Sequence, residues 1–217
     1  MYLQTLMEAG PVLLHASWTT LQISVLAILV GQLLGLPLAV ARVTGPRYVK
    51  ASIDVYVSFF RGVPLLVKIL LIYYFLPGIG INVPPAVAAV LALGMASAAY
   101  VEEIYRATLS AIPTGQFEAA QMLQFSAFAT WTRIVFPQAL KNAVPALASE
   151  MITILKGSAL VSVVGVAELT SSTEIIASEN YRPMQMYLTA AAIYLLFTAV
   201  IETGSHRLEK RLSVGSR

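Results

Sequence analysis

Five long apolar stretches divide this chain, and each is long enough to cross a lipid bilayer as a helix. Such a span needs about 20 mainly apolar residues. The second stretch contains Arg61 and Lys68 and is interrupted by Pro64, which cannot donate a helical hydrogen bond. We therefore expect one domain over residues 1–217, an all-α integral membrane protein with five transmembrane helices at residues 16–41, 55–76, 85–109, 143–167 and 184–204.

Small residues recur at helical spacing in the first and third stretches. They are Gly31, Gly35, Gly94, Ser97, Ala98 and Val101. Such positions let membrane helices approach closely, because hydrophobicity gives no preference between lipid and a neighbouring helix. We expect them to pack inside one subunit, with a contact between two subunits as the alternative.

Composition agrees with a bilayer environment. The chain is 58% hydrophobic and 12% charged, with a mean hydropathy of +0.76, whereas a soluble domain has about 25% charged residues. The absence of cysteine excludes a disulfide scaffold and any thiolate metal site. A net charge of +3, without a basic patch interleaved with aromatic residues, gives no indication of nucleic-acid binding.

Positive charges lie mostly on one side of the predicted spans. Arg182 is on the opposite side, among Glu168, Glu174 and Glu179. Because cytoplasmic loops carry an excess of Lys and Arg, we expect the N-terminus outside and the C-terminus in the cytoplasm. The cations on the predicted cytoplasmic side are Arg42, Arg47, Lys50, Arg106, Arg133, Lys141, Arg207, Lys210, Arg211 and Arg217.

Motifs for catalysis are missing from the sequence. There is no G-x-x-x-x-G-K-[ST] phosphate loop, and the two histidines, His15 and His206, lie at opposite ends of the chain. Neither H-E-x-x-H nor G-x-S-x-G occurs. We therefore expect a non-catalytic membrane subunit that binds no cofactor itself.

The loop over residues 111–142 is long and half polar, which is unusual between two membrane spans. Pro113 should end the helix that leaves the third span, and Thr114 or Gly115 could cap a new short helix. Glu118 would then fall in the first turn, where a carboxylate complements the helix dipole. Ser126 is a plausible Ncap for a second short helix over residues 127–135.

The spacing within residues 118–137, EAAQMLQFSAFATWTRIVFP, resembles the EAA loop of bacterial ABC importer membrane subunits. Gln124 stands where that family has Gly, and Phe136 where it has Leu. Gln124 can take the left-handed conformation of the family's Gly at a cost of about 1 kcal/mol, or the turn has another shape. The alternative is a helical hairpin that packs on its own spans. The resemblance implies contacts with an ATPase subunit at Glu118, Ala119, Ala120, Gln124, Phe125, Ser126, Ala127, Phe128 and Pro137.

Nearly the whole chain from Trp18 onward is similar to the polar amino acid permeases of these importers, the histidine/glutamine/arginine type. The segments FFRGVPLLVKILLIYYFLP, AAYVEEIYRATLSAIPTGQFEAA and LVSVVGVAEL carry this resemblance. It implies a type I ABC importer permease fold, working in identical or homologous pairs in the bacterial inner membrane. The implied partners are an ABC ATPase homodimer, which binds ATP and Mg, and a periplasmic or lipid-anchored amino-acid-binding protein. Gly157 departs from the family, which often reads Lys-Asp-Thr-Ser-Leu where this chain reads Lys156-Gly157-Ser158-Ala159-Leu160.

Glu150 is the clearest charged residue at membrane depth, where an ionisable side chain needs a cavity or a partner. On an ideal helix Thr153, Ile154, Gly157 and Ser158 share its face. One hypothesis is that Glu150 and Ser158 line the substrate path, with the carboxylate facing the ammonium of an amino acid. The alternative is a buried pair between Glu150 and a cation of the second span, Arg61 or Lys68, that fixes helix packing.

Three weaker candidates for the substrate path are Arg61, Ser97 and Tyr100. Arg61 lies in the sequence Phe60-Arg61-Gly62-Val63-Pro64, whose turn could free backbone carbonyls toward a cavity, and we favour a structural role for it. We expect Glu103 and Arg106 to form an ordinary pair on the helix surface.

Other functions remain open at this point. An importer permease for another small polar solute, such as an opine or an osmolyte, would share the same loop. A secondary transporter driven by an ion gradient should show internal repeats with broken helices. The segment with Glu168, Glu174, Glu179 and Arg182 is either a solvated face or a place where a binding protein sits.

Overall fold

A computed structural model describes residues 2–213 of the chain, so Arg217 of the cationic tail lies outside the described residues. The described part contains helices and no strand. The helices are α1 (Tyr2–Thr44), α2 (Arg47–Gly62), α3 (Leu65–Gly78), α4 (Pro85–Ser110), α5 (Thr114–Met122), α6 (Ala127–Thr130), a π-helical turn (Trp131–Val135), α7 (Phe136–Gly157), a 3₁₀ segment (Ser158–Val164), α8 (Leu169–Asn180) and α9 (Pro183–Ser213).

Four stretches of the described chain are helical and apolar enough to cross a membrane. The pair α2 and α3 adds a fifth span if the two helices count as one, although they are bent by 112° at their junction. The span that the sequence predicts over residues 55–76 is divided into two helices at Pro64, the residue that the sequence marks as its interruption. The four stretches are Ala9–Thr44, Pro85–Ser110, Ala127–Val164 and Pro183–Leu212.

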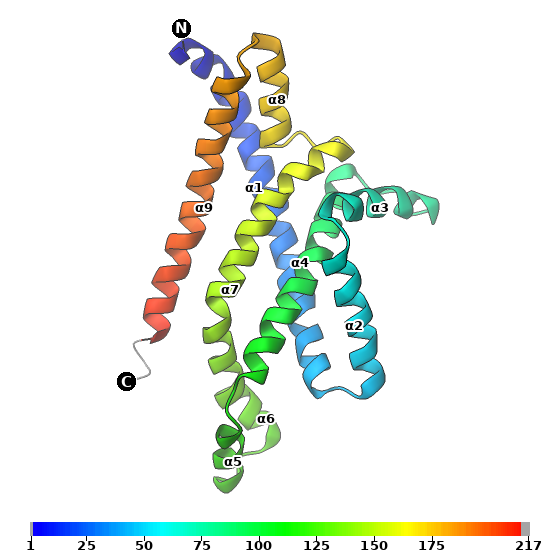
Figure 1. Ribbon diagram of the computed structural model, residues 1–217, viewed down its shortest axis with the longest axis vertical. Helices are drawn as coiled ribbons and strands as arrows, with labels where there is room; N and C mark the ends of the chain where they lie inside the picture. Colours follow the sequence, from blue (N-terminus) through cyan, green and yellow to red (C-terminus); the bar gives the residue numbers. More distant parts are fainter. Residues whose placement is uncertain (1, 214–217) are drawn as a thin grey trace.

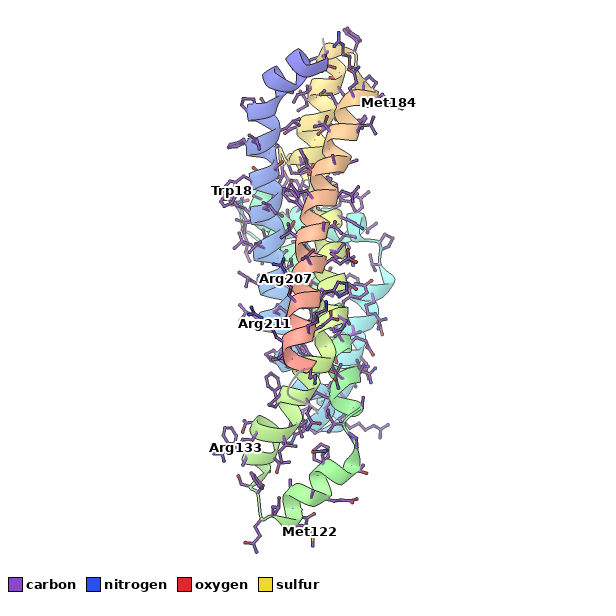
Figure 2. All side chains as sticks on the ribbon, turned by 90° about the vertical axis from the view of Figure 1, so that its left-hand side faces the viewer. Trp18, Met122, Arg133, Met184, Arg207 and Arg211 are labelled. Carbon is purple, nitrogen blue, oxygen red and sulfur yellow. The ribbon has the colours of Figure 1, made fainter. Side chains whose placement is uncertain are left out.

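The long helices run along one axis of an elongated molecule (Figure 1). The N-terminus and α8 lie at the upper end of that view, whereas α5 and α6 extend beyond the other helices at the lower end. The helix α3 projects to the side of the bundle. Figure 2 shows Arg133 near Met122 at the α5 end and Met184 at the far end. The two ends of the molecule therefore differ in structure.

The centre of the fold is the contact between α1 and α4, and the small residues explain it. A Cβ atom placed on Gly31 would lie 2.6 Å from Ser97 Oγ, and one on Gly35 would lie 2.6 Å from Val101 Cγ1. On α4, a Cβ atom at Gly94 would lie 2.6 Å from a methyl carbon of α1. Real side chains do not tolerate such distances, so the glycines permit the two backbones to touch. The predicted packing inside one subunit is confirmed.

Glu168 caps the start of α8 from a fully buried position. Its two carboxylate oxygens accept hydrogen bonds from the backbone N–H groups of Thr170 (2.9 Å) and Ser171 (2.8 Å). The Tyr194 hydroxyl of α9 donates at 3.0 Å, and the Thr20 hydroxyl of α1 lies at 3.5 Å. A solvated position for Glu168 is therefore wrong: the carboxylate joins three helices, although Glu174 and Glu179 are exposed as expected.

Candidate functional site

The first candidate site is the elbow, which we define as residues 114–135 between α4 and α7. The helix α5 begins directly after Pro113, which occupies the Ncap position. The predicted cap at Thr114 or Gly115 is wrong, because no side chain makes a capping hydrogen bond there. Since the helix starts at Thr114, Glu118 is its fifth residue and lies beyond the first turn in which the sequence predicts it.

Gln124 makes the turn that ends α5. Its φ is +56°, which is the left-handed conformation that the Gly of the resembled family would supply. The Phe125 N–H donates to the Ala120 carbonyl at 3.0 Å, and the Gln124 N–H donates to the Gln121 carbonyl at 2.9 Å. These two bonds define a Schellman motif. The family's turn is therefore kept despite the substitution, at a cost of about 1 kcal/mol.

Ser126 caps α6 as the sequence predicts, since its Oγ accepts a hydrogen bond from the Ala129 N–H at 3.2 Å. The predicted continuous helix over residues 127–135 is wrong in its second half, where a π-helical turn covers Trp131–Val135. Pro137 accounts for this change, because it has no N–H for the carbonyl four residues before it. The π-helical turn shifts the pairing by one residue just before α7.

Large apolar side chains are exposed at the tip of the elbow. Met122 is 85% exposed, Leu123 71% and Phe128 79%. Behind this tip the rings of Phe117 and Trp131 meet edge to face, with their centroids 6.4 Å apart. Within the described chain the tip therefore does not pack on its own spans, which counts against the simple hairpin alternative.

Most of the predicted ATPase-contact residues lie on the surface of this elbow or directly after it. Ala120 is the exception, because it is buried under the turn. The exposed ones are Glu118, Ala119, Gln124, Phe125, Ser126, Ala127, Phe128 and Pro137.

The second candidate site is a cavity of about 300 Å³ where α2 and α3 meet α4 and α7. It brings together three of the residues predicted for a substrate path, Arg61, Tyr100 and Glu150. Ser158 does not line it: this residue is fully buried and its hydroxyl donates to the Leu155 carbonyl at 2.8 Å. The other lining residues are Gly62, Val63, Pro64, Leu65, Lys68, Ala96, Thr153 and Ile154.

The break at Pro64 shapes this cavity. Because Pro64 has no N–H, the Phe60 carbonyl loses the donor that a continuous helix would provide. The buried Lys68 replaces that donor, with its Nζ 2.6 Å from the Phe60 oxygen. The freed carbonyl that the sequence suggests is thus present, and Lys68 holds the corner between α2 and α3 together.

Glu150 is 7% exposed, and its Oε1 has no hydrogen-bond partner within the described chain. Its interactions come from the Ser97 hydroxyl and from the charge of Lys68, but no ion pair with Lys68 forms within the described residues. Buried polar atoms in proteins nearly always have a partner, so an orphan oxygen beside a cavity marks Glu150 as a candidate for contact with water or a solute. Ser158, which the sequence places beside Glu150, bonds to the Leu155 carbonyl instead, whereas Ser97, a separate candidate for the substrate path, interacts with Glu150.

Arg61 is paired elsewhere. Its Nη1 lies 3.2 Å from Glu103 Oε2, and its guanidinium stands 5.6 Å from the centroid of the Tyr100 ring. The predicted packing pair between Arg61 and Glu150 is therefore wrong. Arg61 instead joins the cavity to the ion network described next.

An ion network between α1, α2 and α4 is the part of the site that sequence reasoning missed. Arg42 pairs with Asp54 at 2.5 Å, with the fully buried Glu102 at 3.0 Å and with Glu103 at 3.1 Å. The predicted pair of Glu103 and Arg106 is confirmed, but it is one edge of this larger network. Adjacent glutamates inside a span were the available signal, since one of two neighbouring helix positions must face the bundle.

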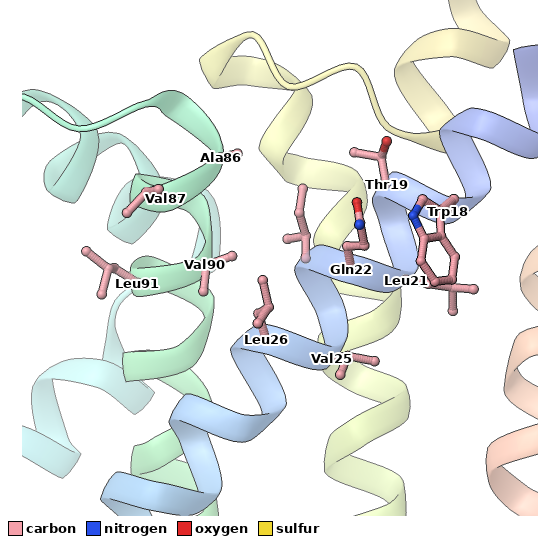
Figure 3. A pocket seen from close by; sticks show the side chains of 11 residues that line it. Trp18, Thr19, Leu21, Gln22, Val25, Leu26, Ala86, Val87, Val90 and Leu91 are labelled. Carbon is pink, nitrogen blue, oxygen red and sulfur yellow. The ribbon is translucent and has the colours of Figure 1, made fainter.

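A larger hollow of about 700 Å³ lies between the upper parts of α1 and α4 (Figure 3). Figure 3 shows Trp18, Leu26 and Leu91 among its lining side chains, with Gln22 and Thr19 as polar ones. No charged residue lines it. It therefore lacks the groups that would hold a charged solute. Among the described residues, no group of three His, Cys, Asp or Glu could hold a metal ion.

The sequence matches the family described as "Binding-protein-dependent transport system inner membrane component" over residues 24–214. A Rickettsia bellii permease protein named for a glutamine transport system is 36% identical over 196 residues, covering 90% of each chain. The nopaline transport system permease protein of Agrobacterium fabrum is 36% identical over 211 residues, covering 93% of this chain and 88% of that one. A crystal structure of an amino acid ABC transporter with histidines has 38% identity and a TM-score of 0.88, with coverage of 97% and 98%.

Proposed function

The chain belongs to the family of binding-protein-dependent transport system inner membrane components, and we propose that it moves a polar amino acid into the cell. As the permease of an ABC transporter, it is a multi-pass protein of the bacterial inner membrane. The glutamine, nopaline and histidine systems among its relatives support an amino acid or amino acid derivative as the solute.

The orphan oxygen of Glu150 is the single observation that carries this proposal. A buried carboxylate without a full set of partners is costly, and a ligand ammonium would offset that cost. The cavity beside it, about 300 Å³, is at the lower end of the usual range for small-molecule sites. An α-amino acid fits this chemistry, because its ammonium would meet Glu150 and its carboxylate would meet a cation of the same cavity.

Arg61 supplies that cation. It lines the cavity and is held there by Glu103 and the Tyr100 ring. When the substrate carboxylate approaches, it competes with Glu103 for the guanidinium. Binding would thereby change the ion network that joins α1, α2 and α4, so a bound solute would bias the transporter between its two states.

The elbow is the second half of the proposal. Its exposed apolar tip suits helix-in-groove recognition by a partner protein. It is joined to α4 by the short segment of residues 111–113 and continues directly into α7. We assign the partner as an ABC ATPase homodimer that binds ATP and Mg, with the elbow on the cytoplasmic side and the N-terminus outside. Two permease copies, identical or homologous, would sit above it, and an external binding protein would deliver the amino acid.

An importer for an opine is the second candidate, because one of the relatives is named for nopaline. Family membership argues against the alternative of a transporter driven by an ion gradient alone. The test is uptake by the complete complex in liposomes, comparing histidine, arginine, glutamine, glutamate and nopaline with and without internal ATP. We expect ATP-dependent uptake of a proteinogenic amino acid. Uptake of nopaline alone would favour the opine reading, and ATP-independent uptake would overturn the proposal.

Charge reversal in the elbow tests the coupling. We expect Glu118→Arg to abolish ATP-driven uptake and to weaken co-purification of the ATPase, while the permease still inserts into the membrane. Glu202→Arg is the matched control, since it reverses an exposed charge on α9, outside both the elbow and the segment with Glu174. Normal uptake by Glu118→Arg would contradict the assignment of the elbow.

A further inference from the structure

Gly157, the last residue of α7, is in direct contact with the first residue of α3. A Cβ atom at Gly157 would lie 2.8 Å from Leu65 Cδ2 and 3.9 Å from Leu93 Cδ2. The shorter distance is not tolerated between real side chains, so any other residue at 157 would displace the tip of Leu65. The absence of a side chain at 157 thus fixes where Leu65 lies.

Leu65 separates the hydrophobic core from the Glu150 cavity. It lines the cavity, and its other side packs against the buried cluster that contains Ile69, Leu93 and Ile154. That cluster is fully or almost fully buried and leaves no room for a displaced methyl group. The tip of Leu65 therefore moves more easily toward the cavity than into this cluster, and the cavity volume would shrink.

Gly157 and Glu150 lie on the same side of α7, seven residues apart. Seven residues rise about 10 Å along a helix, and they return to nearly the same face. Glu150 and Leu65 line the same cavity of about 300 Å³, so the side chain of an amino acid whose ammonium is held by Glu150 shares that space with Leu65.

We propose that Gly157 determines selectivity by side-chain length, because it leaves Leu65 in a position that keeps the far end of the cavity open. This rests on the proposed function, in which Glu150 anchors the substrate ammonium. Gly157 acts through Leu65 and is a positioning residue that does not itself contact the substrate. The site would favour longer polar amino acids, and a bulkier residue at 157 would shorten the accepted side chain.

The test measures direct binding to the purified permease–ATPase complex without the binding protein, so that the delivery protein does not impose its own selectivity. Two probe series vary length at constant charge: asparagine and glutamine, and 2,4-diaminobutyrate, ornithine and lysine. We expect Gly157→Ala to weaken the longest bound member of a series at least 10-fold relative to the shortest, because one misplaced methyl group in a pocket changes discrimination by about 10- to 200-fold.

Two further variants keep the proposal testable even if Gly157→Ala misfolds. Leu65→Ala alone should shift the preference toward the longer probes, and adding it to Gly157→Ala should restore their binding. Gly204→Ala is the matched control, since nothing lies within 4 Å of its Cβ position. A change that is equal for all lengths, or no change, would overturn the role of Gly157. Binding of neither series by the wild-type complex would overturn the proposed substrate class as well.

Discussion

Glu150 on α7 and Glu168 at the start of α8 are two buried carboxylates with opposite surroundings. Glu168 is completely buried and accepts hydrogen bonds from two backbone N–H groups and the Tyr194 hydroxyl. Glu150 is also buried, yet one of its oxygens has no partner in the described chain and it borders a cavity. Burial alone therefore does not identify a functional charge.

The two carboxylates differ in which parts of the protein supply their hydrogen-bond donors and neighbouring charges. Around Glu168 they belong to α1, α8 and α9, so the folded chain supplies them all. Around Glu150 the described residues supply Ser97 and the more distant charge of Lys68. A satisfied buried carboxylate stabilises the fold, whereas an incompletely satisfied one is available to a ligand.

Of the changes that test this comparison, replacing Glu168 should have the largest effect, which is a loss of stability. We expect Glu168→Leu to lower the free energy of unfolding by about 4 kcal/mol, because it removes a helix cap and strips buried donors of their acceptor. Unfolding in mixed detergent micelles measures this, with Glu174→Leu on the exposed face of the same helix as the control. A loss below about 1 kcal/mol would show that the hydrogen bonds around Glu168 are not structural.

The corresponding change at Glu150 should weaken amino acid binding strongly and change stability only slightly. We expect Glu150→Gln to weaken amino acid binding about 100-fold, since it removes a charge-assisted contact to the ammonium. Stability should change by less than about 1 kcal/mol, because the lost carboxylate was poorly satisfied. Binding and unfolding are measured on the same purified complex, with Glu202→Gln on α9 as the control. Unchanged affinity and selectivity would leave Glu150 a packing role only.

The smallest expected effect is on the pH dependence of stability. Burial is the main cause that raises the pKa of Glu168 above its ordinary value of 4.5. A carboxyl whose pKa is raised by folding contributes most below the ordinary value and loses that contribution as pH rises through the raised one. Wild type should therefore lose stability relative to Glu168→Gln as the pH rises above about 4.5. Unfolding curves of both proteins across this range test it, and parallel curves would count against it.

Hydrophobic pattern was enough to locate α4 and α9, because long apolar runs between prolines and charges leave few other choices. It also identified Glu150 as a candidate and Ser126 as a cap. The 112° bend between α2 and α3 could not be predicted from the hydrophobic pattern. Pro64 marks the break in the sequence. The angle between α2 and α3 also involves the contact between Lys68 and the Phe60 carbonyl, which the sequence does not reveal.

The role of Glu168 could not be read from its neighbours in the sequence. Its local segment is rich in charges and hydroxyl groups, which is typical of a solvated loop. Its partners Thr20 and Tyr194 are 148 and 26 residues away. Gln124 could not be predicted for a similar reason. A residue other than glycine at this position did not show whether the backbone takes the left-handed conformation, which only the structure reveals.

The glycines between α1 and α4 have a mechanical consequence. At Gly31, Gly35 and Gly94 the backbone of one helix lies directly against the other helix. No layer of flexible side chains separates α1 from α4 at these positions, so the two helices cannot easily shift relative to each other. The two helices therefore behave as one stiff lever. A displacement applied at the lower end of α4 would therefore move α1 with it.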